Sequence, residues 1–403
     1  MGAVGVIAVK RIPTNSFHQS SKGLFRSLKG SGPDDVARFE DAFAASTCAG
    51  RAFLVGSGTT ALYVILKALS RLAPDKRRVI LPAYTVPTLT LAVKRAGLVT
   101  ALCDVDPATF NLDPARLGEV SGNDTLAVMP VHMFGFPMDL TPIKKLAEER
   151  GFFVIEDAAQ APGAAIDGRP VGGLSETGLF SLCKGKIIST FRGGVATVSD
   201  PKIMDLVADE VDAVRRQTFS QNVRIWGTLA LMAGAVRPEI YGPLYRLIAP
   251  FKSTSLHDHF EPTGGSPLIA RLGMEQLSSL EEQVMARRRN GDALYRELSS
   301  LEGVTLPRIP DTALPSYNHL PIVVDEPGML ARIQRALFER GVDTARMYLK
   351  PIHRIYDLGY PLDTDPFPSA SRIAEGLMVL PTHPGVREKD VEIMIQTIQT
   401  RAG

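Results

Sequence analysis

The sequence AFLVGSGTTALYVILKAL, residues 52–69, places an apolar run, a glycine turn and a helical pattern in immediate succession. Residues 52–56 predict a strand. The following stretch, 59–69, predicts a helix because its apolar residues recur at spacings of three and four, namely Leu62, Ile65, Leu66 and Leu69. A strand that passes through a tight turn into a helix is the repeating unit of an α/β fold.

The same alternation continues through the first half of the chain. Further strands are predicted at 78–83, 98–105, 125–135, 152–160, 178–182 and 194–199, with helices at 85–96 and 140–150. We therefore expect a large domain over 1–265, with a mostly parallel mixed sheet flanked by helices. A smaller α+β domain is expected over 266–403, with one long helical pattern at 267–300, an exposed run at Arg287–Arg289, a strand from 317, a helix at 328–340, a loop and a final helix at 387–401.

Composition excludes several classes of protein. The 403 residues include 45 Lys plus Arg and 43 Asp plus Glu, which is not the basic balance of a nucleic-acid binder. Cys48, Cys103 and Cys183 have no paired spacing, so neither a disulfide scaffold nor a zinc ribbon is expected. No signal peptide is recognised, and a cytoplasmic location is expected. The run His257–His259 has no further ligand at metal spacing, so no metal site is expected.

The turn GSGTTA, 56–61, is a candidate phosphate site. Small residues let backbone N–H groups approach a phosphate, and the helix N-terminus favours negative charge. The string also satisfies the dinucleotide fingerprint G-x-G-x-x-A, but the next strand ends at LPAYT, 81–85, without the acid that would bind a ribose. A smaller phosphorylated cofactor fits better, and the alternative is a turn that only connects strand to helix.

Two further segments carry reactive side chains. VIEDAAQ, 154–160, places Asp157 at the carboxyl end of a buried strand, where it requires a positive partner such as a protonated pyridine nitrogen; the alternative is a helix cap. FSLCKGKIISTFRGG, 180–194, places Lys184 and Lys186 in a glycine-flanked loop. A lysine amine there could form a Schiff base, and the alternative is an ordinary basic loop.

A phosphate cradle, a carboxylate for a pyridinium and a Schiff-base lysine are together the contacts that pyridoxal phosphate needs. In this combination the chain resembles the DegT/DnrJ/EryC1/StrS family of sugar aminotransferases, which have the type I fold of aspartate aminotransferase. The resemblance covers roughly 35–200 and 265–400 and rests on an ordered set of strings: SGTTAL (57–62), ILPAYT (80–85), DVDPATFNLDP (104–114), PVHMFGFPMD (130–139), VIEDAAQAPGA (154–164), the segment with Lys186, LGMEQL (272–277) and LPTHP (380–384).

The resemblance implies roles for particular residues. Lys186 is implied to be the Schiff-base lysine, and Asp157 is implied to keep the pyridine nitrogen protonated. The remaining cofactor contacts implied by the family are Gly58, Thr59, Thr60, Tyr84, Gln160 and Ser181. His132 lies in a segment that borders the cofactor in the family, whereas His353 and His383 are interpreted as hydrogen-bonded structural residues.

The implied activity is transfer of an amino group, with glutamate as donor, to a keto sugar nucleotide in a surface polysaccharide or glycosylated metabolite pathway. A homodimer with active sites at the subunit boundary is implied as well. The alternatives are a catalytically silent regulatory protein that binds pyridoxal phosphate, another sugar-modifying enzyme that uses the cofactor, and a nicotinamide oxidoreductase.

Three departures from the family pattern affect this interpretation. Val86 occupies a position that is often aromatic and stacks on the cofactor ring, and Arg192 replaces a frequent glutamate. The asparagine that normally reaches the phosphate of the partner subunit is not recognisable before the helix at 267, where the chain reads PTGGSPLIARLG, 262–273.

An apolar insertion is expected near 219–260. Its centre, IWGTLALMAGAV at 225–236, is flanked by Arg224 and Arg237 and is too short for the roughly 20 residues of a membrane-spanning helix. The segment is interpreted as a helix and loop that cover the core or a subunit interface. The alternative is that 224–251 contacts a membrane surface or a lipid-linked acceptor.

Overall fold

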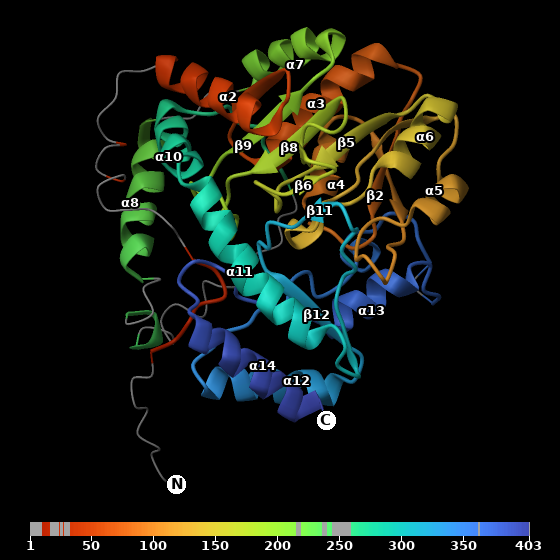
Figure 1. Cartoon of the computed structure of the whole chain (residues 1–403). Helices are drawn as coiled ribbons and strands as arrows, with labels where there is room; N and C mark the ends of the chain where they lie inside the picture. The colour runs from red at the N-terminus through yellow and green to blue at the C-terminus, as the bar shows by residue number, and fades with distance from the viewer. Residues whose placement is uncertain are drawn as a thin grey trace.

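The chain folds around a seven-stranded sheet. The computed structural model describes residues 10–16, 24, 27, 33–214, 219–235, 240–243, 259–361 and 363–402. From edge to edge the strands are β1 (Arg51–Val55), β9 (Gly194–Val198), β8 (Thr177–Ser181), β5 (Phe153–Asp157), β4 (Thr125–Val128), β2 (Arg78–Pro82) and β3 (Val99–Cys103). Only β9 runs antiparallel to its neighbours, which confirms the predicted mixed, mostly parallel sheet (Figure 1).

Both faces of this sheet are covered by helices. Alternate residues of a strand point to opposite faces, so each strand contributes side chains to two buried clusters. In β1, Phe53 and Val55 join one buried cluster while Ala52 and Leu54 join the other. The first cluster includes residues of α3 (Gly58–Leu72), α4 (Leu89–Arg95) and α7 (Pro201–Ala213). The second includes residues of α2 (Pro33–Thr47), α5 (Pro114–Val120), α6 (Thr141–Arg150) and α10 (Pro267–Leu277). Burial on both faces explains why the strands are nearly continuous apolar runs.

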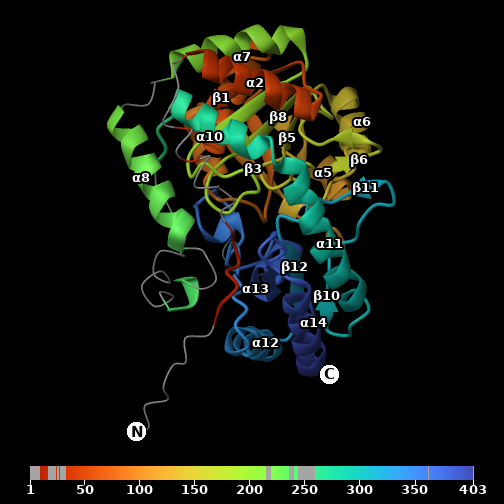
Figure 2. The same ribbon diagram turned by 60° about the vertical axis from the view of Figure 1, so that its left-hand side comes forward.

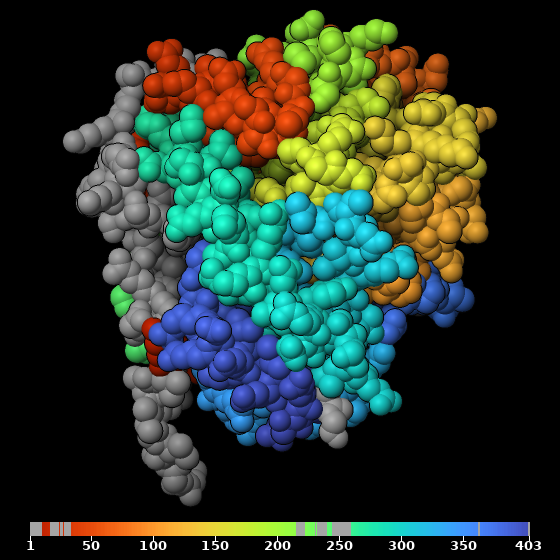
Figure 3. Space-filling view, in the orientation of Figure 1, coloured from red at the N-terminus to blue at the C-terminus, as the bar shows by residue number. Residues whose placement is uncertain are grey.

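A smaller lobe follows the sheet domain. It is built from α11 (Leu280–Leu298), the antiparallel strands β10 (Val304–Thr305), β12 (Leu320–Val324) and β13 (Leu377–Leu380), and the helices α12 (Pro327–Glu339), α13 (Pro368–Gly376) and α14 (Glu388–Ala402). Figure 3 shows this lobe in cyan and blue, packed directly against the sheet domain. A second small sheet joins the two parts of the chain through β11 (Ala313–Leu314), β6 (Ala165–Ile166) and β7 (Arg169–Pro170).

The helical pattern predicted at 267–300 is not one helix. It is interrupted at Ser278 and Ser279, where α10 ends and α11 begins. Serine competes for backbone hydrogen bonds and favours helix ends, so two in succession allow the break. α10 packs against α2 beside the sheet, whereas α11 runs into the smaller lobe (Figure 1). The domain boundary at 265/266 stays a prediction.

Other expectations require correction. The predicted exposed run Arg287–Arg289 is wrong for its first member, because Arg287 is only 4% exposed. The loop predicted between 340 and 387 contains α13 and β13. The short apolar run of β13 pairs with β12 and is buried, and its length alone did not identify it as a strand.

The apolar stretch after residue 219 forms α8 (Phe219–Ala235), which lies at the edge of the molecule beside α10 (Figures 1 and 2). Within the described parts of the chain, no helix combines the length and apolar character needed to cross a membrane. The same described residues contain no group of three His, Cys, Asp or Glu side chains that could hold a metal. His257 and Asp258 lie outside the described residues.

Candidate active site

The predicted site residues meet at the carboxyl edge of the sheet. Asp157 is the last residue of β5, and Ser181 is the last residue of the adjacent strand β8. Lys186 lies in the loop that follows β8, and Gly58 begins α3 immediately after β1. In α/β sheets ligands bind at this edge, where loops from neighbouring strands converge.

Asp157 is a buried carboxylate, with 3% of its surface exposed. Its Oδ1 accepts a hydrogen bond from the Ala159 backbone N–H at 2.9 Å. Burial raises the pKa of the Asp157 carboxyl, while this hydrogen bond and the nearby Lys186 lower it. An aspartate whose ionised form is penalised by burial is suited to a cationic ligand group, which would restore the lost solvation.

The two candidate lysines occupy different environments. Lys184 is exposed, whereas Lys186 is half-buried and interacts electrostatically with Asp157. Burial lowers the pKa of the Lys186 ammonium, and the Asp157 carboxylate opposes that shift. A lysine with a lowered pKa is the more effective nucleophile and proton acceptor at neutral pH. This chemistry therefore favours Lys186 over Lys184.

The start of α3 forms a cradle against Ser181. Ser57 caps the helix, and its Oγ accepts from the Thr60 N–H at 3.0 Å. A Cβ on Gly58 would lie 2.9 Å from the Ser181 Cβ, so only glycine allows the two backbones this close approach. The N–H groups of a first helical turn have no intrahelical acceptor and point outward, which suits a phosphate. Gly58, Thr59, Thr60 and Ser181 are thus brought together.

Gln160 leaves an oxygen without a partner among the described residues. Its Nε2 donates to Met133 Sδ at 3.2 Å and to Tyr348 Oη at 3.5 Å, but its buried Oε1 accepts no hydrogen bond from the part of the chain that the structure describes. A buried amide oxygen of this kind is normally satisfied, so it indicates a missing donor. The phenolic hydroxyl of pyridoxal phosphate is such a donor. Together with the glycine cradle and the Asp157 carboxylate, the residues present fit this cofactor.

Tyr348, from the smaller lobe, reaches the same place. Its ring packs edge-on against Tyr84, with centroids 5.7 Å apart, and burial raises its pKa, with Asp157 adding to the rise. The Tyr84 hydroxyl donates to the Met347 carbonyl at 2.6 Å, so this predicted cofactor residue also links the two lobes. Sequence analysis missed Tyr348, because nothing in the local pattern of 346–353 distinguishes it. Tyr348 and Val86 both pack, partly buried, against the same buried cluster.

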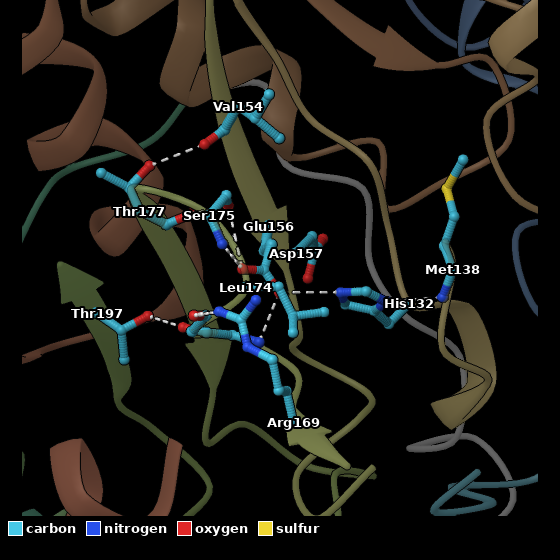
Figure 4. Close-up of polar contacts among 12 residues, drawn as sticks. His132, Met138, Val154, Glu156, Asp157, Arg169, Leu174, Ser175, Thr177 and Thr197 are labelled. Atoms are coloured by element: carbon cyan, nitrogen blue, oxygen red, sulfur yellow. Dashed lines mark hydrogen bonds and ion pairs between the residues drawn. The ribbon is translucent and has the colours of Figure 1, made fainter. Parts of the chain in front are cut away.

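His132 and Glu156 form a hydrogen-bond network next to Asp157. The Glu156 carboxylate is fully buried and accepts from the Gly172 N–H and the Ser175 N–H, both at 2.6 Å, and from the Ser175 hydroxyl at 3.0 Å (Figure 4). His132 Nδ1 accepts from the Met138 N–H, so the hydrogen-bond network assigns its proton to Nε2, which lies 3.2 Å from Glu156 Oε2. The His132 backbone N–H in turn holds the Asp157 carbonyl at 2.9 Å.

This network predicts a pH-dependent contribution to stability. Burial alone would raise the pKa of Glu156, but its hydrogen bonds with His132, Gly172 and Ser175 hold the pKa below the usual 4.5. The stabilisation is therefore complete above about pH 4.5 and is lost as pH falls through the lower folded-state pKa. Glu156→Gln should lower the free energy of unfolding by about 3 kcal/mol at pH 7. The amide NH2 of glutamine would replace one carboxylate oxygen and would face N–H donors that then lose their acceptor.

Thermal unfolding followed by circular dichroism between pH 3 and pH 7 tests this, with the exposed Glu149→Gln as control. The difference in unfolding temperature between the wild type and Glu156→Gln should become smaller as the pH is lowered. Because the raised pKa of Asp157 contributes the opposite slope in both proteins, the difference between the curves is the informative quantity. A gap of equal size at every pH would contradict the assignment.

A second network holds the lysine loop from the smaller lobe. Asn318 Nδ2 donates to the Gly185 carbonyl at 3.2 Å and contacts His319 Nδ1 at 3.0 Å, and His319 Nε2 lies 2.8 Å from Asn15 Oδ1. Burial, followed by the charges of Arg287, His383 and Lys186, lowers the pKa of His319 to about 3, so the ring is neutral. These residues were not predicted from sequence, because they belong to segments far from the lysine.

Arg287 completes this network at its buried end. Its Nη1 donates to the Asn318 carbonyl at 3.1 Å, while its buried Nε has no hydrogen-bond partner in the described parts of the chain. Burial lowers the Arg287 pKa to about 10. A buried arginine that donates to a backbone carbonyl fixes the position of that backbone. Arg287 therefore fixes Asn318, whose side chain holds Gly185.

Asn318→Ala should therefore loosen the lysine loop. We expect about a fivefold to tenfold fall in kcat, the value of roughly one hydrogen bond, with little change in KM for the amino donor. The pH at which the visible absorption of the cofactor-loaded enzyme titrates should also move. Asn318→Gln, which retains a donor, should recover part of both effects. Unchanged kcat and an unchanged titration in Asn318→Ala would rule out a positioning role.

The departures from the family pattern have structural counterparts. The segment after Glu261 closes over the cradle from the same chain: Thr263 accepts from the Gly56 N–H at 2.7 Å through its carbonyl and donates its own N–H to Thr60 Oγ1 at 3.4 Å. Arg192 is exposed.

His383 is hydrogen-bonded, with Nε2 2.8 Å from the Pro13 carbonyl. The expectation that His353 is hydrogen-bonded is wrong for the described residues: both of its buried ring nitrogens lack a hydrogen-bond partner there, and the Asp365 carboxylate oxygen lies 3.6 Å away.

Comparison with known proteins agrees with this geometry. A sequence model of the DegT/DnrJ/EryC1/StrS aminotransferase family matches residues 18–234 and 266–399. GDP-perosamine synthase of Caulobacter vibrioides is 30% identical over 366 residues, which are 90% of this chain and 89% of that protein. 3-Amino-5-hydroxybenzoate synthase of Amycolatopsis mediterranei is 29% identical over 339 residues, which are 83% of this chain and 79% of that protein.

Solved structures show the same fold. The aminotransferase from Psychrobacter cryohalolentis superposes with a TM-score of 0.76 at 23% identity, covering 97% of this chain and 98% of that one. Fold and sequence together define an enzyme of the pyridoxal-phosphate-dependent aminotransferase class. The chain belongs to the DegT/DnrJ/EryC1/StrS aminotransferase family, a family of sugar nucleotide aminotransferases.

Proposed function

We propose that this protein uses pyridoxal phosphate to move an amino group from an amino acid to the ketone of a nucleotide-linked sugar. The observation that carries the proposal is that the half-buried Lys186 follows β8 and the buried Asp157 ends the adjacent strand β5, where the two side chains interact electrostatically. GDP-perosamine synthase, a relative at 30% identity, is named for an amino sugar nucleotide, which supports this class of acceptor.

The residues would hold the cofactor at three points. The first turn of α3 and Ser181 would bind the phosphate, Asp157 would accept from the protonated ring nitrogen, and Gln160 Oε1 would accept from the ring hydroxyl. When bound, pyridoxal phosphate supplies an aldehyde for amines and an electron-withdrawing ring. Tyr84 and Tyr348 would line the site beside the ring, in place of the aromatic residue that the family often has at Val86.

Proton transfer falls to Lys186. Burial lowers the Lys186 pKa, which favours an amine that would take a proton from the α-carbon of the donor and later return one to the sugar carbon that receives nitrogen. Asp157 keeps its negative charge beside a cationic ring nitrogen and thereby stabilises charge that develops during proton removal. The donor leaves as its 2-oxo acid, and the keto sugar leaves as an amino sugar. With glutamate as donor, two-step ping-pong kinetics are expected.

Three further features belong to the proposal. The amino sugar would enter a surface polysaccharide or a glycosylated metabolite. The resemblance to the family supports a homodimer with each site near the subunit boundary, which light scattering tests. A cytoplasmic location is supported by three cysteines that are all unpaired in the described residues.

The experiment is a spectrum followed by an assay. Purified protein loaded with pyridoxal phosphate should have a visible absorption band that shifts when glutamate is added. The treated enzyme should then aminate at least one member of a panel of GDP-, UDP- and dTDP-linked keto sugars, detected by mass. A band that responds to no amino acid favours the regulatory alternative. No band after loading would refute cofactor binding altogether.

A further inference from the structure

The outer face of α8 exposes large apolar side chains to solvent. Its inner face is anchored, because Ile225 and Leu229 are buried in the core and the Trp226 indole donates to the Leu24 carbonyl at 3.4 Å. The outer face carries Val223, 54% exposed, and Leu231, 73% exposed. Between them a Cβ on Gly227 would meet no atom within 4 Å. The spacing of four aligns these three positions on one side of the helix.

Positive charge accompanies this apolar face. Arg224 is exposed on the same side, next to Val223. From 215 to 252 the sequence contains one acidic residue, Glu239, and six basic ones, Arg215, Arg216, Arg224, Arg237, Arg246 and Lys252. The whole chain has a net charge of only +2, so the rest of the molecule is net negative. The excess of basic residues is therefore confined to this segment.

The family match includes α8 as far as residue 234, and the chain departs from the family only after it. The family match stops at residue 234 and resumes at 266, so the chain that directly follows α8 has no counterpart in the matched pattern. That unmatched stretch continues the apolar and basic composition, with Ile240 exposed among its described residues.

We propose that the outer face of α8, formed by Val223, Arg224, Gly227, Thr228 and Leu231, binds the surface of an anionic lipid bilayer. Exposed apolar side chains would enter the acyl boundary while arginines meet the negative headgroups, which is how interfacial helices bind. The helix would lie on the membrane, since no described helix can cross it. This inference does not depend on the proposed enzymatic function.

Charge distinguishes a lipid surface from a second copy of this chain. A second copy of this chain carries the same basic segment and a net charge of +2, so it offers no overall negative charge to attract this face. An anionic surface complements the same charges. Contact with a membrane also suits the apolar exposure, because Leu231 is the most exposed large hydrophobic residue of the described chain.

Flotation of the full-length, cofactor-loaded protein with vesicles tests the proposal. The wild type should float with vesicles containing phosphatidylglycerol, float less with pure phosphatidylcholine, and dissociate as salt rises. Leu231→Glu and Arg224→Glu should each reduce the bound fraction at least about fivefold, because one loses apolar burial and the other reverses a charge. Met285→Glu on α11, at a position 61% exposed, is the matched control and should float like the wild type.

Other outcomes would overturn the proposal. Wild-type protein that floats with neither vesicle has no membrane surface. If Leu231→Glu instead changes the mass measured by light scattering, the face is a subunit interface. Thermal unfolding of each variant checks the fold, and Val223→Glu on the same face provides a second test if Leu231→Glu unfolds.

Discussion

Lys186→Ala should abolish amino transfer, with kcat at least about 1,000-fold lower than in the wild type. The half-buried amine is expected both to hold the cofactor and to carry the proton, and alanine can do neither. The visible band of the loaded protein should disappear or shift at the same time. Stopped assays with glutamate and a keto sugar nucleotide, together with absorption spectra, measure the two effects.

Lys184→Ala is the matched control for this variant. Lys184 lies two positions earlier in the same loop and is exposed, so its loss should change kcat less than about twofold. Circular dichroism on both variants separates lost chemistry from lost folding. A fully active Lys186→Ala enzyme, or an inactive Lys184→Ala enzyme with a normal fold, would mean that the other lysine carries the reaction.

Asp157→Asn should lower kcat by about 100-fold or more, because a neutral amide cannot keep a ring nitrogen protonated. The asparagine oxygen can still accept from the Ala159 N–H, so the geometry of the loop should persist. Asp124→Asn, which changes an exposed carboxylate paired with Arg78, controls for loss of a surface charge and should remain active. Retention of more than a tenth of wild-type kcat in Asp157→Asn would contradict the assigned role.

The same variant has an expected signature in the cofactor-free protein. The pKa of Asp157 is raised above its usual 3.8 in the folded state. The folded state therefore takes up this proton more readily than the unfolded state, and the protein gains stability as pH falls through the folded-state pKa. Asp157→Asn should lack that gain. Unfolding temperatures of both proteins between pH 4 and pH 7 measure it, and parallel curves would show that Asp157 does not titrate as described.

Local sequence determined the sheet domain and the parts of the site that lie directly after its strands. Apolar runs separated by helical patterns define the strands, because burial on both faces leaves a signal that needs no distant partner. Asp157, Ser181 and Gly58 are adjacent in sequence to strand ends, so their meeting at one edge follows from parallel packing. Lys184 and Lys186 are different, because the resemblance to a family, and not the loop composition, selected one of them.

The tertiary structure alone decided which other residues reach that edge. Tyr348 meets Gln160, and Asn318 holds Gly185, across separations of more than 130 residues, which no local periodicity records. Arg287 has the charge of a surface residue, yet the smaller lobe buries it against Asn318. A pattern in sequence reports which face of an element avoids water, whereas the partner that covers that face is set by how the lobes pack together.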